Sequence, residues 1–128
     1  MDIYAKNILD HYQRPHNFGP LSGAAAHHEL NHSCGDDITV YLKMEAGKIK
    51  QLSFEGHGCS ISMAATSILS EALVGREIAE VLKLDLSDIQ KILGIDISLR
   101  REKCALIGLR AVQGAIKESI LEISKSTH

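Results

Sequence analysis

The stretch 38–44 reads Ile-Thr-Val-Tyr-Leu-Lys-Met, with an apolar side chain at every second position. A period of two predicts a half-buried strand. Residues 45–48, Glu-Ala-Gly-Lys, predict a hairpin turn, and residues 49–54 predict the return strand. Residues 24–31 alternate more weakly and are expected to supply a third strand. The centre of the chain is therefore predicted to be a small antiparallel sheet.

The segment before this sheet shows a helical pattern followed by an irregular one. Residues 2–13 place apolar side chains among polar ones, as a short amphipathic helix does. Arg14-Pro15 is expected to end that helix, because proline disfavours helical geometry in the residue before it. Residues 16–23 contain asparagine, glycine and proline and are predicted to form a loop.

Beyond the sheet the apolar period becomes that of core-facing helices. One helix is predicted from Ser60 to about Ala72, with Gly75 as its stop. Two short helices are expected around Asp85, and Gly94 fits a helix C-cap.

The last helix is expected over about residues 101–125. Its predicted core face consists of Leu109, Val112, Ile116 and Ile120. This order of elements implies an α+β fold, with helices packed on one face of a sheet of about three strands. We expect one domain over residues 1–128, with residues 124–128 frayed.

Composition narrows the class of protein. A chain of 128 residues with 45% hydrophobic content is expected to bury a core, which the lack of tryptophan makes aliphatic. A net charge of −2 argues against nucleic-acid binding. No apolar run reaches the roughly 18 residues that a membrane span needs. The amino-terminal residues show no signal pattern, so a cytoplasmic protein with reduced thiols is expected.

Three cysteines stand where a loop meets a regular element. Cys34 opens Cys-Gly-Asp, Cys59 ends Gly-His-Gly-Cys before a predicted helix, and Cys104 lies where the last helix begins. An odd number argues against a framework made only of disulfides. Three thiolates and one nearby carboxylate would make a four-ligand set for a tetrahedral metal ion or an iron–sulfur cluster.

Two of the cysteines stand in settings that favour thiolate. Cys59 precedes a helix, whose free N–H groups and positive dipole end stabilise an anion. Cys104 has Arg101 and Lys103 beside it, and the alternative is that these two charges are simply solvated, as most such charges are. The alternative is that the cysteines are buried and act as small hydrophobic residues. Glycines 35, 56 and 58 favour a site instead, because they let the backbone approach a bulky group.

Other polar residues leave more than one interpretation open. Asp36 is either a ligand or an aspartate of a turn or N-cap, and Asp37 is expected to be solvated. His57 is an alternative ligand or an outer partner of one. We expect three further histidines at the surface: His27, His28 and His32. The sequence contains no phosphate-binding loop, no dinucleotide fingerprint and no context for a catalytic triad.

Taken in order, these motifs resemble the iron–sulfur scaffold family of IscU, SufU and NifU amino-terminal proteins. The resemblance covers nearly the whole chain and includes residues 12–19, Tyr-Gln-Arg-Pro-His-Asn-Phe-Gly. It implies a NifU/IscU-like fold and the ligands Cys34, Asp36, Cys59 and Cys104. It also implies a transient [2Fe–2S] cluster, built with sulfur from a cysteine desulfurase and iron from a donor, and passed to recipient apo-proteins.

The chain departs from both main branches of that family. IscU-type members carry histidine before the third cysteine, beside a Leu-Pro-Pro-Val-Lys stretch that a dedicated Hsp70 chaperone binds. Here residues 97–104 read Ile-Ser-Leu-Arg-Arg-Glu-Lys-Cys, which argues against that chaperone as a partner. Arg-x-Lys-Cys-Ala resembles the zinc-holding SufU branch. The insertion that SufU proteins carry between the second and third cysteines is missing, however.

Three functions follow for testing. The first is a non-enzymatic scaffold that holds zinc in its cluster-free form. The second is a zinc-bound sulfurtransferase that stimulates a desulfurase, and the third is a structural zinc domain. For sulfur delivery we expect Cys104 to accept the persulfide, with Lys103 and Arg101 stabilising its thiolate. Cys34 is its main competitor.

Overall fold

Three antiparallel strands form one sheet in the order β1-β2-β3. They are β1 (Ala25–Asn31), β2 (Asp36–Glu45) and β3 (Lys48–His57). The structure is a computed structural model that describes residues 3–32 and 35–126. Along β2 the buried positions alternate, which confirms the face predicted from stretch 38–44. Ala46 and Gly47 connect β2 to β3 with positive φ values of 54° and 76°, as a tight hairpin requires.

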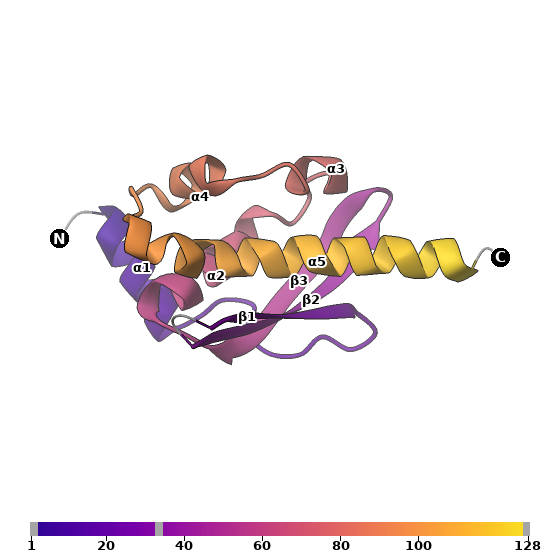
Figure 1. Ribbon diagram of the computed structural model, residues 1–128, viewed down its shortest axis with the longest axis horizontal. Helices are drawn as coiled ribbons and strands as arrows, with labels where there is room; N and C mark the ends of the chain where they lie inside the picture. The colour runs from indigo at the N-terminus through magenta and orange to yellow at the C-terminus, as the bar shows by residue number, and fades with distance from the viewer. Residues whose placement is uncertain (1–2, 33–34, 127–128) are drawn as a thin grey trace.

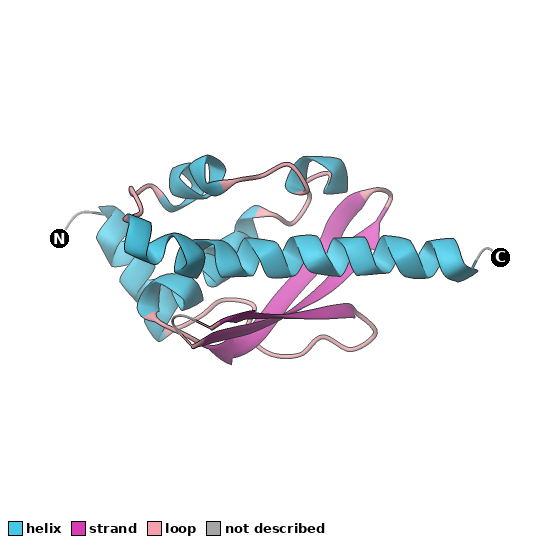
Figure 2. Ribbon diagram, viewed as in Figure 1, coloured by secondary structure: helices cyan, strands magenta, loops and turns pink. Residues whose placement is uncertain are grey.

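The remaining elements are helical. They are α1 (Ile3–Gln13), α2 (Ser60–Ala72), α3 (Ile78–Val81), α4 (Leu86–Leu93), the 3₁₀ turn η1 (Leu99–Arg101) and α5 (Glu102–Ser126). Helix α5 runs along the long axis of the molecule, over β1 and β2 (Figure 1). Helix α2 packs against α1, α5 and β3. Figure 2 shows the helices gathered on one side of the sheet, so the predicted α+β architecture is confirmed.

Local sequence signals explain where the short helices begin and end. Asp85 caps α4, because its side chain accepts from the N–H of Asp88 while the Asp88 side chain accepts from the N–H of Asp85. Gly94 ends α4 in the left-handed conformation, as predicted. The core is aliphatic except for Phe54, which is fully buried on β3. Throughout the described chain, the helices are too short or too polar to cross a membrane.

Helix α2 spans Ser60–Ala72, as predicted, and Gly75 lies in the turn that follows it, where its N–H donates to the carbonyl of Ile49. Two other expectations need correction. Ile120 was predicted in the core but is 48% exposed, because the end of α5 extends beyond the sheet (Figure 1). His27 was predicted at the surface but is half-buried under α5. A β-carbon at Gly114 would overlap its ring, so this glycine makes the space.

Candidate metal centre

Two of the predicted cysteine ligands and the predicted carboxylate meet at one end of the sheet. The ligand atoms of Asp36, Cys59 and Cys104 all lie within 4.8 Å of one another. They come from the first residue of β2, the N-cap of α2 and the first turn of α5. Cys34, the fourth predicted ligand, lies outside the described residues. The arrangement joins three elements that are far apart in the sequence.

Asp36 is held by three hydrogen bonds in a fully buried position. Its Oδ1 accepts from the backbone N–H of Cys59 at 3.1 Å and from the Ser62 hydroxyl at 3.2 Å. Its Oδ2 accepts from the Asn31 amide at 3.3 Å. The side chain is 0% exposed and belongs to a strand, so the alternative of a turn aspartate is wrong. The alternative of an N-cap aspartate is correct in part, because the Asp36 carboxylate accepts from the N–H of Cys59, the N-cap residue of α2.

Cys59 is the N-cap of α2, as its position in the sequence suggested. Its Sγ accepts from the backbone N–H of Ser62 at 3.5 Å, and the Ser62 hydroxyl lies 3.6 Å away. Burial disfavours the charged thiolate. Hydrogen bonds from Ser62, Cys104 and the Ile61 backbone outweigh burial and place the pKa of Cys59 below its ordinary value. The prediction of a thiolate-favouring setting at Cys59 is confirmed.

Cys104 lies deeper than Cys59. It is 2% exposed, whereas Cys59 is half-buried, so solvent reaches the site from the Cys59 side. Arg101 and Lys103 are exposed residues next to it in sequence. Their influence on the Cys104 thiol stays a prediction.

Gly58 lets the loop before α2 approach Asp36. A β-carbon at this position would overlap the Ser62 hydroxyl and lie 2.9 Å from Oδ1 of Asp36. At Gly56, whose φ is 146°, a β-carbon would overlap the backbone carbonyl of Asp37. Both glycines therefore allow close contact with β2, and protein atoms fill the space that we expected an inorganic group to use.

The histidines contribute little to this centre. His57, the proposed alternative ligand, is exposed at the end of β3 and is not among the three grouped ligands. His28 and His32 are exposed as predicted, and His28 pairs with Asp37. Sequence reasoning missed Ser62 and Asn31, which orient the carboxylate. Ser62 could have been found from its position, because the third residue of a helix commonly hydrogen-bonds to the N-cap residue.

The donor set suits a soft or borderline metal. Zinc–ligand bonds of about 2.0–2.3 Å put two ligands of a tetrahedral ion about 3.5 Å apart. The spacing of Asp36, Cys59 and Cys104 needs only a small contraction to reach that value. Thiolate sulfur favours zinc or iron–sulfur clusters, while the carboxylate is a harder ligand that exchanges more readily. The spacing of the three described ligands therefore fits a zinc ion, and their donor types also suit an iron–sulfur cluster as cargo.

Known proteins are similar in sequence to this chain over most of its length. The zinc-dependent sulfurtransferase SufU of Bacillus subtilis is 32% identical over 134 aligned residues, covering 91% of this chain and 91% of that protein. The iron–sulfur cluster assembly scaffold protein IscU of Streptococcus pyogenes is 31% identical, covering 91% of this chain and 84% of that protein.

A solved structure shares the fold. The amino-terminal NifU-like protein from Brucella abortus superposes with a TM-score of 0.73 over 90% of this chain and 92% of that one, at 24% identity. The sequence profile described as the NifU-like N terminal domain matches residues 3–123, a span that includes every residue of the centre. With two cysteines and an aspartate converging where the motifs predicted, the chain belongs to the family of NifU-like N-terminal domains.

Proposed function

We propose that this protein is a scaffold on which a transient [2Fe–2S] cluster is assembled and from which it is passed to recipient apo-proteins. The buried Asp36 carboxylate between Cys59 and Cys104 carries the proposal. Cys34, two residues before Asp36 in the sequence, is proposed as the fourth ligand. The scaffold name of the Streptococcus pyogenes relative supports the same assignment.

The mixed ligand set suits a cluster that must leave. Many stable electron-transfer clusters, such as those of ferredoxins, use four cysteine thiolates. One carboxylate among thiolates is matched less well to a sulfide-rich iron centre and can be displaced by a thiolate of a recipient. The half-buried Cys59 side gives that incoming thiolate access.

Sulfur is proposed to arrive as a persulfide from a cysteine desulfurase. This transfer requires the start of α5 to move, because Cys104 is 2% exposed. The Cys104 thiolate then attacks the terminal sulfur of the desulfurase persulfide, so a new S–S bond forms on Cys104 and the desulfurase thiolate leaves. Lys103 and Arg101 are proposed to stabilise the attacking thiolate. Two electrons from an external dithiol then release the sulfur as sulfide, while an iron donor supplies the metal. Alkylation and mass mapping of the persulfide test this assignment, and label on Cys34 would contradict it.

A second function has its own support. The Bacillus subtilis relative is named a zinc-dependent sulfurtransferase, and residues 101–105 here resemble that branch. In that function the same ligands bind zinc, and a cysteine carries sulfur while no cluster is assembled.

Anaerobic reconstitution with a desulfurase, ferrous iron and cysteine separates these functions. Iron and acid-labile sulfide bound to the wild type, and lost in Cys59→Ser, support the scaffold. Retained zinc with faster desulfurase turnover and no cluster supports the sulfurtransferase. Retained zinc with neither activity leaves a structural zinc domain and contradicts both proposals.

A further inference from the structure

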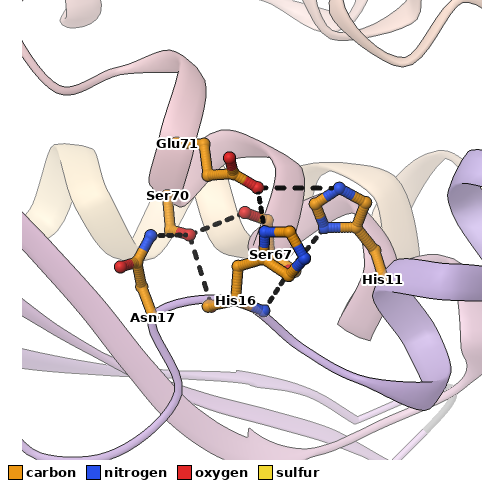
Figure 3. A network of polar contacts seen from close by, with 6 residues as sticks. All are labelled: His11, His16, Asn17, Ser67, Ser70 and Glu71. Carbon is orange, nitrogen blue, oxygen red and sulfur yellow. Dashed lines mark hydrogen bonds and ion pairs between the residues drawn. The ribbon is translucent and has the colours of Figure 1, made fainter.

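A second group of metal-ligating side chains lies away from the cysteines. His11 near the end of α1, His16 in the following loop and Glu71 in the last turn of α2 point toward one another (Figure 3). Their ligand atoms all lie within 4.8 Å of one another. Glu71 is twelve positions beyond Cys59, and a rise of about 1.5 Å per residue separates the two groups by about 18 Å along α2. The two groups therefore cannot share one ion.

His11 is fixed in the orientation that a metal ligand needs. It is 6% exposed, and its Nδ1 lies 2.7 Å from the Ser67 hydroxyl. Its other nitrogen, Nε2, lies 3.7 Å from Oε1 of Glu71. That separation is too long for a hydrogen bond but matches two ligands of one ion. Histidines that bind metal commonly engage a polar partner through the second nitrogen, as His11 engages Ser67.

The loop that carries His16 is anchored to α2 by its backbone. The His16 N–H donates to the Ser67 hydroxyl at 2.7 Å, so Ser67 holds both histidines. Asn17 donates to the Ser70 hydroxyl at 3.0 Å, which extends the same network (Figure 3). The two imidazole rings have centroids 4.3 Å apart, and His16 contacts Glu71 directly. The His16 and Glu71 side chains are half-exposed, and because they contact each other directly, they have to separate to coordinate one ion.

We propose that His11, His16 and Glu71 form a second binding site for a divalent transition-metal ion such as Zn²⁺. Two imidazoles and one carboxylate suit zinc or ferrous iron. Three protein ligands leave at least one position for water. Because the site lacks thiolate, it is chemically distinct from the cysteine centre. An ion held there joins α1 and its following loop to α2.

The test counts zinc ions and identifies their ligands. Zinc is titrated into the reduced protein of residues 1–128 against a chromophoric chelator, and cobalt(II) substitution reports sulfur ligands through thiolate-to-cobalt absorption. His16→Gln and Glu71→Gln alter half-exposed side chains and leave the buried His11 in place. Each is expected to bind one equivalent less than the wild type, with unchanged thiolate-to-cobalt absorption.

His27→Gln is the matched control, because His27 also contacts carboxylates but, among the described residues, belongs to no metal-ligating group with a second histidine. It is expected to retain the wild-type number of ions. The proposal is overturned if His16→Gln binds as many ions as the wild type, or if the lost equivalent is the one that absorbs through thiolate. Loss of an equivalent in His27→Gln also overturns it, because ordinary histidine–carboxylate pairs would then account for the binding. Cluster assembly does not enter this test, so it can fail or succeed independently of the scaffold function.

Discussion

The backbone N–H of Cys59 donates to the carboxylate of Asp36 over 3.1 Å, joining the N-cap of α2 to the first residue of β2. One proposed ligand therefore positions the backbone of another. A substitution at Asp36 changes both the ligand set and the geometry that holds Cys59. The two effects separate when one variant keeps a ligand at this position and another removes it.

Asp36→Cys is expected to lengthen the lifetime of a reconstituted cluster and slow its transfer to an apo-ferredoxin, because the fourth ligand becomes a soft thiolate. Asp36→Ala removes the acceptor of the hydrogen bonds from Cys59, Ser62 and Asn31, so we expect a stability loss of about 1–3 kcal/mol in the metal-free protein. If Asp36 actively promotes ligand exchange, Asp36→Ala also slows release; if it is only a ligand, the cluster is lost faster. Decay and transfer rates, with denaturant midpoints as the fold control, check these outcomes. Parent-like rates in both variants would remove Asp36 from the site.

Ser62→Ala is expected to raise the pKa of Cys59, because the hydroxyl is one of the donors that stabilise its thiolate. In metal-free protein, the midpoint of the iodoacetamide rate against pH should then move to higher pH. Ser60→Ala is the matched control, since Ser60 is an exposed residue of the same helical turn. Equal midpoints for Ser62→Ala and the wild type would contradict the role of the hydroxyl.

Gly58→Ala is expected to weaken zinc binding at the cysteine centre. The added β-carbon overlaps the Ser62 hydroxyl and crowds Oδ1 of Asp36, so the Ser62 side chain and the Asp36 carboxylate must give way. Competition with a zinc chelator measures the loss of affinity. Gly114→Ala introduces a comparable overlap with His27, away from the cysteine centre, and should leave that affinity unchanged. Equal losses in the two variants would point to a general effect on the fold.

His27 is expected to stabilise the protein more at low pH than at high pH. Burial opposes its charge, but hydrogen bonds to Glu29 and Glu118 outweigh burial and raise the pKa of His27 above 6.5. Both ring nitrogens contact a carboxylate, at 2.7 and 2.6 Å, and only the protonated ring can donate to both. Because the pKa of His27 is raised in the folded state, its stabilising effect is complete below pH 6.5. That effect is lost as the pH rises through the folded-state pKa.

Urea denaturation of His27→Gln checks this linkage. The variant should lose stability relative to the wild type below pH 6.5 and lose less above the folded-state pKa. A difference that does not change with pH would show that His27 acts through packing alone.

Short-range sequence patterns predicted much of the fold. Stretch 38–44 predicted β2 because its alternation is strict, and Asp85 and Gly94 marked the ends of α4 through their own backbone chemistry. Ile120 and His27 were misplaced for a different reason. Their burial depends on how far α5 reaches past the sheet and on the space beside Gly114, which are properties of tertiary packing.

The site residues likewise divide into those that local sequence predicted and those that depend on tertiary packing. Cys59 and its thiolate setting followed from a cysteine directly before a helix, and Asp36 gained weight only from the family resemblance. The group of His11, His16 and Glu71 was missed, because α1 and α2 meet only through packing across the sequence. Short-range spacing carries no signal for such a meeting.

The distribution of the cysteine centre over β2, α2 and α5 has a consequence for the newly made chain. A polypeptide is synthesised from its amino-terminal end, so Asp36 and Cys59 exist well before Cys104. Cys104 reaches them only after α5 has packed onto the sheet. A metal ion that needs sulfur from both α2 and α5 is therefore retained only by a chain whose last helix is in place. If the cysteine centre holds a metal ion as proposed, metal retention would therefore distinguish chains in which α5 has packed from nascent ones.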